Sequence, residues 1–444
     1  MSTSQVATGG RLLRTLSTTP GRYRAFAAAC LVGLLVTVLG TSLSARELQR
    51  STERVRTQSG PVLIATQQVF SSLAEADAAA TAEHLAGAGN GRDQRRLYED
   101  ALERAARQID VISSRIGDDD AAHRAVADLL VGINRYAGAI ETARAKKAAG
   151  APDADAALAA ALSVSSASIT PAVATLLDRT NERITDDTRT TTFTWLGLLA
   201  LVALVGAQVA ITRRTRRLVN VPLAIATLVT VVALVWLALA AQRQGDDVRD
   251  ARAVGIGSIG LTGNIQATAY RAKAAESLAL IAGTGAASTE QFTLAATNAT
   301  ALYAGPIDTV AVQQARAGAR LPGSGLLADA ALVADSARER ASIAEVLARW
   351  ERYRATSATI RTAAGSAGTI ATARTIATDE GNRAFNGFNL AVENFLADNR
   401  AQFEAHLDAA NDRLRLLEVG MLVLPLLAAA LALWGIQIRW NEYR

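Results

Sequence analysis

The chain has 444 residues, half of them apolar, with a formal net charge of +5 and a mean hydropathy of +0.17. This hydropathy is atypical of a soluble enzyme, and a single cysteine, Cys30, excludes a disulfide-stabilised framework. A membrane protein is the class that remains, and its spans should appear as long uncharged segments.

Four segments contain no charged side chain, at residues 25–45, 193–212, 218–242 and 419–438. Each has about 20 residues or more, the length a helix needs to cross a bilayer core of roughly 30 Å. The first is longer than the apolar region of a cleaved signal peptide, and bulky Leu43 stands where a cleavage site needs a small residue. We therefore expect four transmembrane helices, the first of which is an uncleaved anchor.

The short segments outside these spans are basic. Residues 1–24, 213–217 and 439–444 carry a combined charge of +9, whereas the long segments 46–192 and 243–418 carry −4. Excess Lys and Arg marks the cytoplasmic side of a membrane protein. We therefore expect a multi-pass protein of the cell membrane, with both termini in the cytoplasm and both long segments outside it.

A cluster of arginines separates the second span from the third. The five residues 213–217 contain no acid and four arginines, namely Arg213, Arg214, Arg216 and Arg217. These charges fit the cytoplasmic turn of a helical hairpin, where they also meet anionic lipid headgroups. The sequence pI of about 9.6 therefore indicates contact with membrane lipid, and we expect no nucleic-acid partner.

Both outer segments have the composition and periodicity of helices. Apolar residues recur at helical spacing in two stripes of the first segment: Val69, Leu73, Ala76 and Ala80, and then Leu97, Ala101, Ala105, Ile109, Ile112 and Ile116. Turn residues interrupt the pattern at 87–93, 117–120, 150–155, 283–288, 319–325 and 364–368, and Pro171 is expected to kink or restart a helix. Because an amphipathic stripe needs neighbours to bury it, we expect an all-α protein with a four-helix bundle in each outer segment.

The two halves of the chain resemble one another. The stretch LAEADAAATAEHLAGAG at 73–89 aligns with AYRAKAAESLALIAGTG at 269–285, although most of the identities are Ala and Gly. The order of span, outer segment and span is the same in both halves. The sequence therefore predicts that the two bundles form a pseudo-repeat.

No pattern of catalytic or metal-binding residues appears in the sequence. The three histidines, His84, His123 and His406, lie far apart, and we expect each on a surface or in a groove. The run Asp118 to Asp120 lacks the ligand spacing of a Ca²⁺ loop and is better interpreted as a solvated loop or a helix N-cap. No cytoplasmic segment is long enough for a catalytic domain. We therefore expect a protein that is not an enzyme and has no catalytic residues, metal or cofactor.

The chain resembles the GlnX-type transmembrane sensors of actinobacteria over nearly its whole length. The stretches that carry the resemblance are TPGRYR (19–24), SLAEADAAATAEHLAG (72–87), YAGAIETARA (136–145), RRTRRLVNVP (213–222), AESLALIAGTG (275–285) and LALWGIQIRWNEYR (431–444). The sequence departs from the family after 145, where PDADAALAAALSVSSAS replaces a bulkier helix.

The resemblance implies a role between two partners. An extracytoplasmic solute-binding lipoprotein loaded with glutamate, aspartate or glutamine would dock on the outer bundles. The signal would then pass to a cytoplasmic Ser/Thr kinase, protein kinase G. Whether the chain forms a homodimer is left open.

Two sets of residues are candidates for partner contacts. The basic residues next to the membrane are candidates for the kinase-facing surface, or only set the topology: Arg22, Arg24, Arg213, Arg214, Arg216, Arg217 and Arg439. In the YAGAIETARA stretch, Tyr136, Glu141 and Arg144 are candidates for extracytoplasmic contacts. The alternative is that Tyr136 packs inside the bundle while Glu141 and Arg144 are solvated.

Three functions are compatible with this sequence. The first is a non-enzymatic signal transducer with an external binding-protein partner, which we favour. The second is a direct small-molecule receptor, which needs a charged pocket among the helices. The third is a structural scaffold of an envelope complex.

Overall fold

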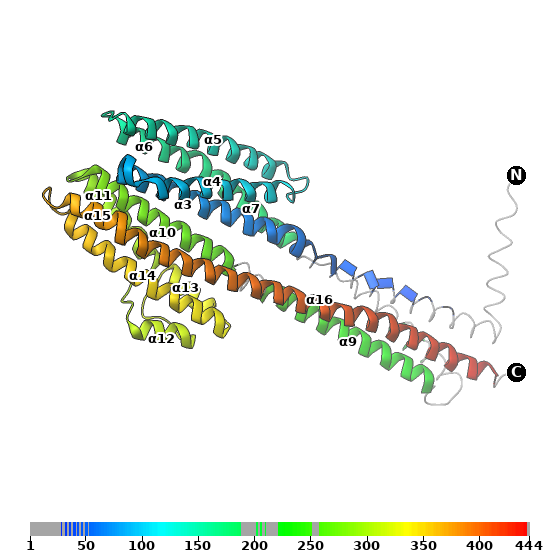
Figure 1. Ribbon diagram of the computed structural model, residues 1–444. Helices are drawn as coiled ribbons and strands as arrows, with labels where there is room; N and C mark the ends of the chain where they lie inside the picture. Colours follow the sequence, from blue (N-terminus) through cyan, green and yellow to red (C-terminus); the bar gives the residue numbers. More distant parts are fainter. Residues whose placement is uncertain are drawn as a thin grey trace, which may run out of the picture. The chain divides into compact units, whose positions relative to one another are not determined.

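The computed structural model describes residues 55–187, 221–250 and 257–441, with isolated positions between 28 and 54 and between 201 and 209. Every regular element in these ranges is a helix, as Figure 1 shows, and the only β-type pairing there is an isolated bridge between Ala304 and Ser324. The prediction of an all-α protein is therefore confirmed for this part of the chain.

The chain divides into two compact units. The large unit contains Val55–Asp186 and Asp250–His406, and the small unit contains Met1–Arg54, Asp187–Arg249 and Leu407–Arg444. The two segments predicted to lie outside the membrane thus contribute almost all of the large unit. The segments predicted to cross the membrane or to reach the cytoplasm belong to the small unit.

The first half of the large unit has four long helices. A π-helical turn, η1 (Val55–Ser59), leads into α3 (Gly60–Asn90), α4 (Arg92–Ser113) and α5 (Asp120–Ala148), and the fourth helix comprises α6 (Ala154–Val164), η2 (Ser165–Ile169) and α7 (Thr170–Asp187). The helix breaks therefore fall at the turn residues that the sequence indicated. The predicted N-cap is also confirmed, because the Asp119 carboxylate accepts hydrogen bonds from the backbone N–H groups of Ala121 and Ala122.

The two predicted apolar stripes form the core of this half. Val69, Leu73, Ala76 and Ala80 of α3 are buried, and so are the residues of the α4 stripe except Leu97, which is half-buried and packs against the same cluster. Helical periodicity therefore identified the inner faces of both helices, because a residue every three or four positions returns to one side of a helix.

Proline at position 171 does not end its helix. α6, η2 and α7 follow one another without a break, and the π-helical segment ends at Ile169, two residues before Pro171. Proline lacks the N–H that would close an ordinary helical turn, so a wider turn at this place allows the helix to continue. Near Pro171, where the sequence predicted a kink or a restart of the helix, the structure has the π-helical segment η2 within a continuous helix.

The second half of the large unit has more helices than the four expected. Its long helices are α10 (Gly257–Ala282), α11 (Ala286–Leu302), α14 (Ala337–Ala364) and the run of α15 (Ile370–Ile376), η4 (Ala377–Gly381) and α16 (Asn382–Asn441). The residues of α16 after His406 belong to the small unit. Two short helices, α12 (Thr309–Ala317) and α13 (Leu326–Val333), lie between α11 and α14. The predicted breaks at 283–288, 319–325 and 364–368 are present, whereas those after Leu302 and Val333 were not predicted.

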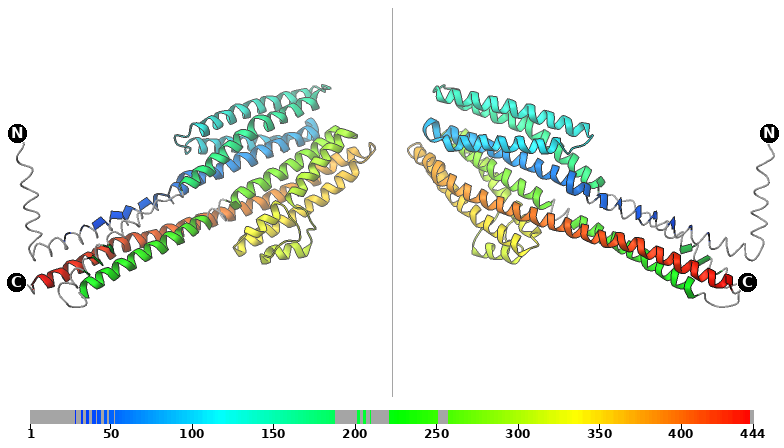
Figure 2. Two further views of the ribbon diagram at one scale, coloured as in Figure 1. Left: turned by 180° about the vertical axis from the view of Figure 1, so that it is seen from behind. Right: turned by 45° about the vertical axis from the view of Figure 1, so that its right-hand side comes forward.

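The two halves are not separate bundles. α3 and α10, the first long helix of each half, lie side by side, as both views of Figure 2 show. Ala74 and Ala78 of α3 belong to the core of the second half, which centres on an aromatic cluster formed by Tyr270, Trp350, Tyr353, Phe385 and Phe388. Small alanine side chains let the two helix backbones approach closely, so the two halves pack against each other within the large unit.

Positions that the predicted repeat aligns make equivalent contacts. Asp77 of α3 aligns with Lys273 of α10. The Asp77 carboxylate accepts a hydrogen bond at 3.0 Å from the hydroxyl of Ser165, the first residue of η2. The Lys273 ammonium donates at 3.4 Å to the carbonyl of Ala377, the first residue of η4. In each half, a buried ionisable group on the first long helix thus contacts the start of a π bulge on the last.

Two helices of the small unit have many exposed apolar side chains. On α9 (Val221–Asp250), Ile225, Leu228, Val232 and Val235 are exposed, whereas Ala226 and Ala233 are buried. The C-terminal part of α16 likewise exposes Leu426, Leu427, Leu433 and Trp434 and buries Ala428 and Ala432. Helices that pack together in lipid have this pattern, because their large apolar side chains face outward and their small side chains face the neighbouring helix.

One helix among the described residues is long and apolar enough to cross a membrane by length and composition. It is Ala154–Asp186, with 33 residues and a hydropathy of 1.5, and a shorter apolar helix spans Ala224–Ala233. The longer helix is not one of the predicted spans. Its first part, α6, packs along α5 in the large unit.

Candidate functional site

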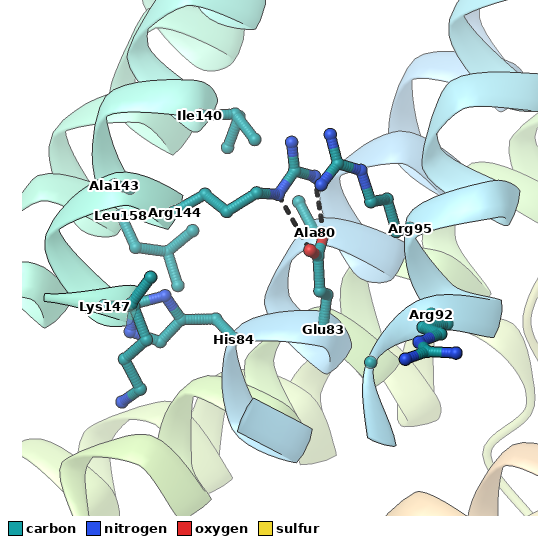
Figure 3. Close-up of a pocket in the computed structure, with 12 residues that line it drawn as sticks. Ala80, Glu83, His84, Arg92, Arg95, Ile140, Ala143, Arg144, Lys147 and Leu158 are labelled. Carbon is teal, nitrogen blue, oxygen red and sulfur yellow. Dashed lines mark hydrogen bonds and ion pairs between the residues drawn. The ribbon is translucent and has the colours of Figure 1, made fainter. Parts of the chain in front are cut away.

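A pocket of about 310 Å³ lies among the helices of the first half, near the turn that joins α3 to α4. Figure 3 shows its lining, which combines an apolar wall with long basic side chains. The apolar wall is formed by Ala80, Ile140, Ala143 and Leu158, and the basic side chains are Arg92, Arg95, Arg144 and Lys147. Glu83 and His84 complete the polar lining.

Arg144 is fixed in the pocket by two carboxylates. Its Nε and Nη2 atoms donate to the two carboxylate oxygens of Glu83 at 2.7 and 2.6 Å, and a third nitrogen donates to Glu141. The guanidinium also stacks over the ring of Tyr98, 5.4 Å from its centroid. Because Arg144 and Glu83 are each only 16 % exposed, this paired geometry holds α5 against α3 and orients the guanidinium at the pocket.

A histidine connects the pocket to α6. The His84 side chain is buried, and its Nε2 atom lies 2.7 Å from a carboxylate oxygen of Asp155, which also accepts from the Lys147 ammonium at 3.2 Å. Burial lowers the pKa of His84, against the opposing effect of the Asp155 hydrogen bond. At neutral pH the ring is therefore uncharged, and its Nε2–H donates to the carboxylate.

The remaining two arginines come from the first turn of α4 and are exposed. The Arg95 guanidinium reaches toward that of Arg144, as Figure 3 shows, and it also donates to Glu99 at 2.9 Å across one turn of its own helix. Arg92, the first residue of α4, has no side-chain hydrogen bond or ion pair with the part of the chain that the structure describes. The pocket lining therefore has four basic side chains and one carboxylate, so its mouth favours an anion.

Residues 51–189 match the actinobacterial sensor domain. This match covers the whole first half of the large unit and includes every residue that lines the pocket. No curated protein and no solved structure is significantly similar to the chain. The family match supports an actinobacterial sensor protein with a role in sensing or signalling.

Two of the stretches that carry the sequence resemblance meet at the pocket of the sensor domain. Residues 72–87 supply Glu83 and His84, and residues 136–145 supply Ile140 and Arg144. They lie on different helices and are joined by the ion pair between Glu83 and Arg144. The segment that departs from the resemblance, α6, contributes Leu158 to the same pocket and Asp155 behind it.

The three residues predicted to contact an extracytoplasmic partner differ in how exposed they are. Tyr136 is fully buried in the core of the sensor domain, with its ring 6.2 Å from that of Tyr98, so it offers no surface to a partner. Glu141 is exposed beside Arg144. Arg144 lies at the pocket, half-buried, with its charge directed inward.

The cytoplasmic candidates fall largely outside the described residues. These are Arg22, Arg24, Arg213, Arg214, Arg216 and Arg217. Arg439 belongs to α16. Their proposed contact with a kinase therefore stays a prediction.

A second group of buried charges lies in the other half of the large unit. Lys273 and Glu276 of α10 are 3 % and 1 % exposed, and their charged atoms are 3.3 Å apart. The Glu276 carboxylate accepts further hydrogen bonds from the hydroxyls of Tyr353, at 3.3 Å, and Ser357. Lys273 also donates a hydrogen bond to the carbonyl of Ala377. The network therefore links α10 and α14 to the π-helical segment η4, which precedes α16. In the described ranges, no group of three His, Cys, Asp or Glu side chains is placed to hold a metal ion.

Proposed function

We propose that this chain is a non-enzymatic transmembrane signal transducer, in which the large unit responds to amino-acid availability outside the cell. An extracytoplasmic solute-binding lipoprotein that carries glutamate, aspartate or glutamine would dock on this unit. The short basic segments on the inner side would pass the signal to a cytoplasmic Ser/Thr kinase. The match of residues 51–189 to the actinobacterial sensor domain supports the sensing role, and the resemblance to GlnX-type sensors supports the partners.

The observation that carries the proposal is the continuity of α16. This helix runs from Asn382 to Asn441 without a break. It begins directly after η4, which contacts the buried Lys273, and it contains the predicted fourth span at 419–438. Since packed helices shift as rigid elements in known switches, a rearrangement at η4 can be carried along α16 into the small unit.

The exposed apolar faces of α9 and α16 support the membrane part of the proposal. The side chains of Leu228 and Val232 on α9 and of Leu426 and Trp434 on α16 are exposed to solvent in the part of the chain that the structure describes. Soluble proteins seldom expose such large apolar side chains in rows, whereas lipid-facing helices do. We propose that these faces contact the acyl chains of the cell membrane, with both termini in the cytoplasm.

The four arginines of the predicted inner turn, at 213–217, would give a partner a compact positive surface. Together with Arg22, Arg24 and Arg439 they are the residues through which we propose contact with the kinase. We propose that the kinase supplies the phosphorylation chemistry and that this chain acts by changing its contacts with the kinase.

Insertions into α16 test the relay. One inserted alanine after Glu404 rotates the following helix by about 100°, whereas seven restore its original direction to within about 20°. We expect one alanine to abolish the response of the kinase to extracellular glutamate and seven to retain most of it. The measurement is phosphorylation of the kinase's substrate in cells that express each variant at equal membrane levels. Equal responses from all three proteins would contradict transmission through α16.

A further inference from the structure

The sensor-domain pocket has the composition of a ligand site rather than of a packing defect. Four basic side chains from two helices, α4 and α5, line one space that is backed by aliphatic side chains. Like charges repel, so placing them around one pocket costs free energy unless an anion or a fixed carboxylate offsets it. Glu83 offsets Arg144, but no carboxylate within the lining is left for Arg92 and Arg95.

The size and the apolar wall limit what the anion can be. A volume of about 310 Å³ lies at the lower end of the range for small-molecule sites, so it suits a ligand of few atoms. Ile140, Ala143 and Leu158 give the ligand an aliphatic contact. A planar guanidinium matches a carboxylate in two-point geometry, and the guanidinium-bearing side chains of Arg92 and Arg95 both line this pocket.

We infer that this pocket binds a small organic carboxylate directly, with Arg92 and Arg95 as its carboxylate-binding residues and the aliphatic wall around its carbon chain. The inference goes beyond the relay proposed above, because it gives the chain a ligand of its own that needs no docked lipoprotein.

The basic side chains divide into a fixed group and an available group. Arg144 already makes three hydrogen bonds to protein carboxylates, and Lys147 is bonded to Asp155. Arg95 is bonded only to Glu99, in an exposed pair across one helical turn, a type that contributes little to stability. The ligand can therefore bind to Arg92 and Arg95 without breaking the contacts that hold α3, α5 and α6 together.

The test uses the full chain in lipid nanodiscs, without lipoprotein or kinase. Isothermal titration calorimetry is run with four separate probes, glutamate, succinate, isovalerate and inorganic phosphate. The variant Arg92→Gln/Arg95→Gln removes both proposed carboxylate contacts. Arg96→Gln is the matched control, because Arg96 lies on the same turn of α4, is exposed and pairs only with Asp93 outside the pocket.

We expect saturable binding of at least one of the three organic carboxylates, weakened at least about tenfold by Arg92→Gln/Arg95→Gln and less than about twofold by Arg96→Gln. Unchanged circular dichroism would show that the variants fold. The inference is overturned if none of the carboxylates binds, if only phosphate binds, or if the pocket variant binds as well as the control. Since the titration contains no kinase and no lipoprotein, its failure leaves the relay through α16 to be judged by the insertion experiment.

Discussion

Glu83 of α3 and Arg144 of α5, separated by 61 positions in the chain, form a two-point ion pair with donor–acceptor distances of 2.7 and 2.6 Å. The pair joins the two sequence stretches that carry the family resemblance, and it forms one side of the pocket. The Arg144 guanidinium thus joins two helices and lines the pocket, whereas carboxylate binding is proposed for Arg92 and Arg95. Substitution of Glu83 tests the structural role of the ion pair.

Glu83→Gln should destabilise the large unit. The substitution leaves a half-buried guanidinium with Glu141 as its only carboxylate partner, and breaking such a pair costs about 1–3 kcal/mol. The free energy of unfolding, measured by urea titration of the full chain, checks this. Asp93→Asn is the control, since the Asp93–Arg96 pair is 80 % and 74 % exposed and should change stability by less than about 0.5 kcal/mol. Equal losses in both variants would contradict the structural role of Glu83.

Asp77→Asn should alter how stability depends on pH. Asp77 is buried beside Ser165 and Tyr136, and burial raises the pKa of its carboxyl from 3.8 to about 6. A carboxyl whose pKa is higher in the folded state stabilises the fold fully below pH 3.8, and this stability is lost as the pH rises through about 6. The loss corresponds to about 3 kcal/mol, and asparagine, which cannot ionise, avoids it.

The measurement is the difference in unfolding free energy between Asp77→Asn and the parent chain at several pH values from 4 to 7.5. We expect the unfolding free energy of the variant to rise relative to that of the parent chain as the pH rises, and the difference to level off above about pH 6.5. Glu103→Gln is a suitable control, because that exposed carboxylate pairs only with Arg107 on its own helix. A constant difference across the range would show that Asp77 has the same pKa in the folded and unfolded states.

Lys273→Met alone should lower the free energy of unfolding much more than the double substitution Lys273→Met/Glu276→Leu does. The single substitution leaves the Glu276 carboxylate buried without its cation, and removing one partner of a buried pair typically costs about 3–5 kcal/mol. The double substitution replaces the pair with apolar groups, so a large part of this loss should be recovered. A double-mutant cycle on unfolding free energies measures the coupling, and losses that simply add would contradict an interaction between the two residues.

The helical pattern of the large unit was open to prediction because it depends on local chemistry. Apolar spacing identified the buried stripes of α3 and α4, and glycine and aspartate marked the breaks, including the cap at Asp119. The helix end after Leu302 was missed. There the chain turns extended at Tyr303, and Gly305 adopts a φ of 154°, which side-chain-bearing residues rarely adopt.

The pocket could not be predicted, because its residues meet only through tertiary packing. Nothing local indicates that Glu83 faces Arg144, or that Arg95 reaches toward the same space from α4. The packing of α3 against α10 was missed for a related reason, since alanine-rich faces carry little periodic signal about which helix covers them. The presence of Glu83 and Arg144 within the two resembling stretches was the available clue to the site.

Cysteine accessibility should place the large unit outside the cell. The chain has a single cysteine, Cys30, so a Cys30→Ala background allows one new thiol at a time. Ser163 on α6 and Thr289 on α11 are exposed side chains in the two halves of the large unit, whereas Arg216 lies in the predicted inner turn. We expect a membrane-impermeant maleimide to label Ser163→Cys and Thr289→Cys in intact cells, because both should face the extracytoplasmic solution.

Arg216→Cys serves as the inner control and should react only after the membrane is permeabilised, since the positive-inside rule assigns its segment to the cytoplasm. Because the four charges of this turn are expected to set the orientation, single replacement is preferable to removal of the cluster. Labelling of Ser163→Cys only in permeabilised cells would place the sensor domain in the cytoplasm. The docking of an extracytoplasmic lipoprotein would then be impossible, while the carboxylate site would still be testable as an intracellular sensor of the same ligand class.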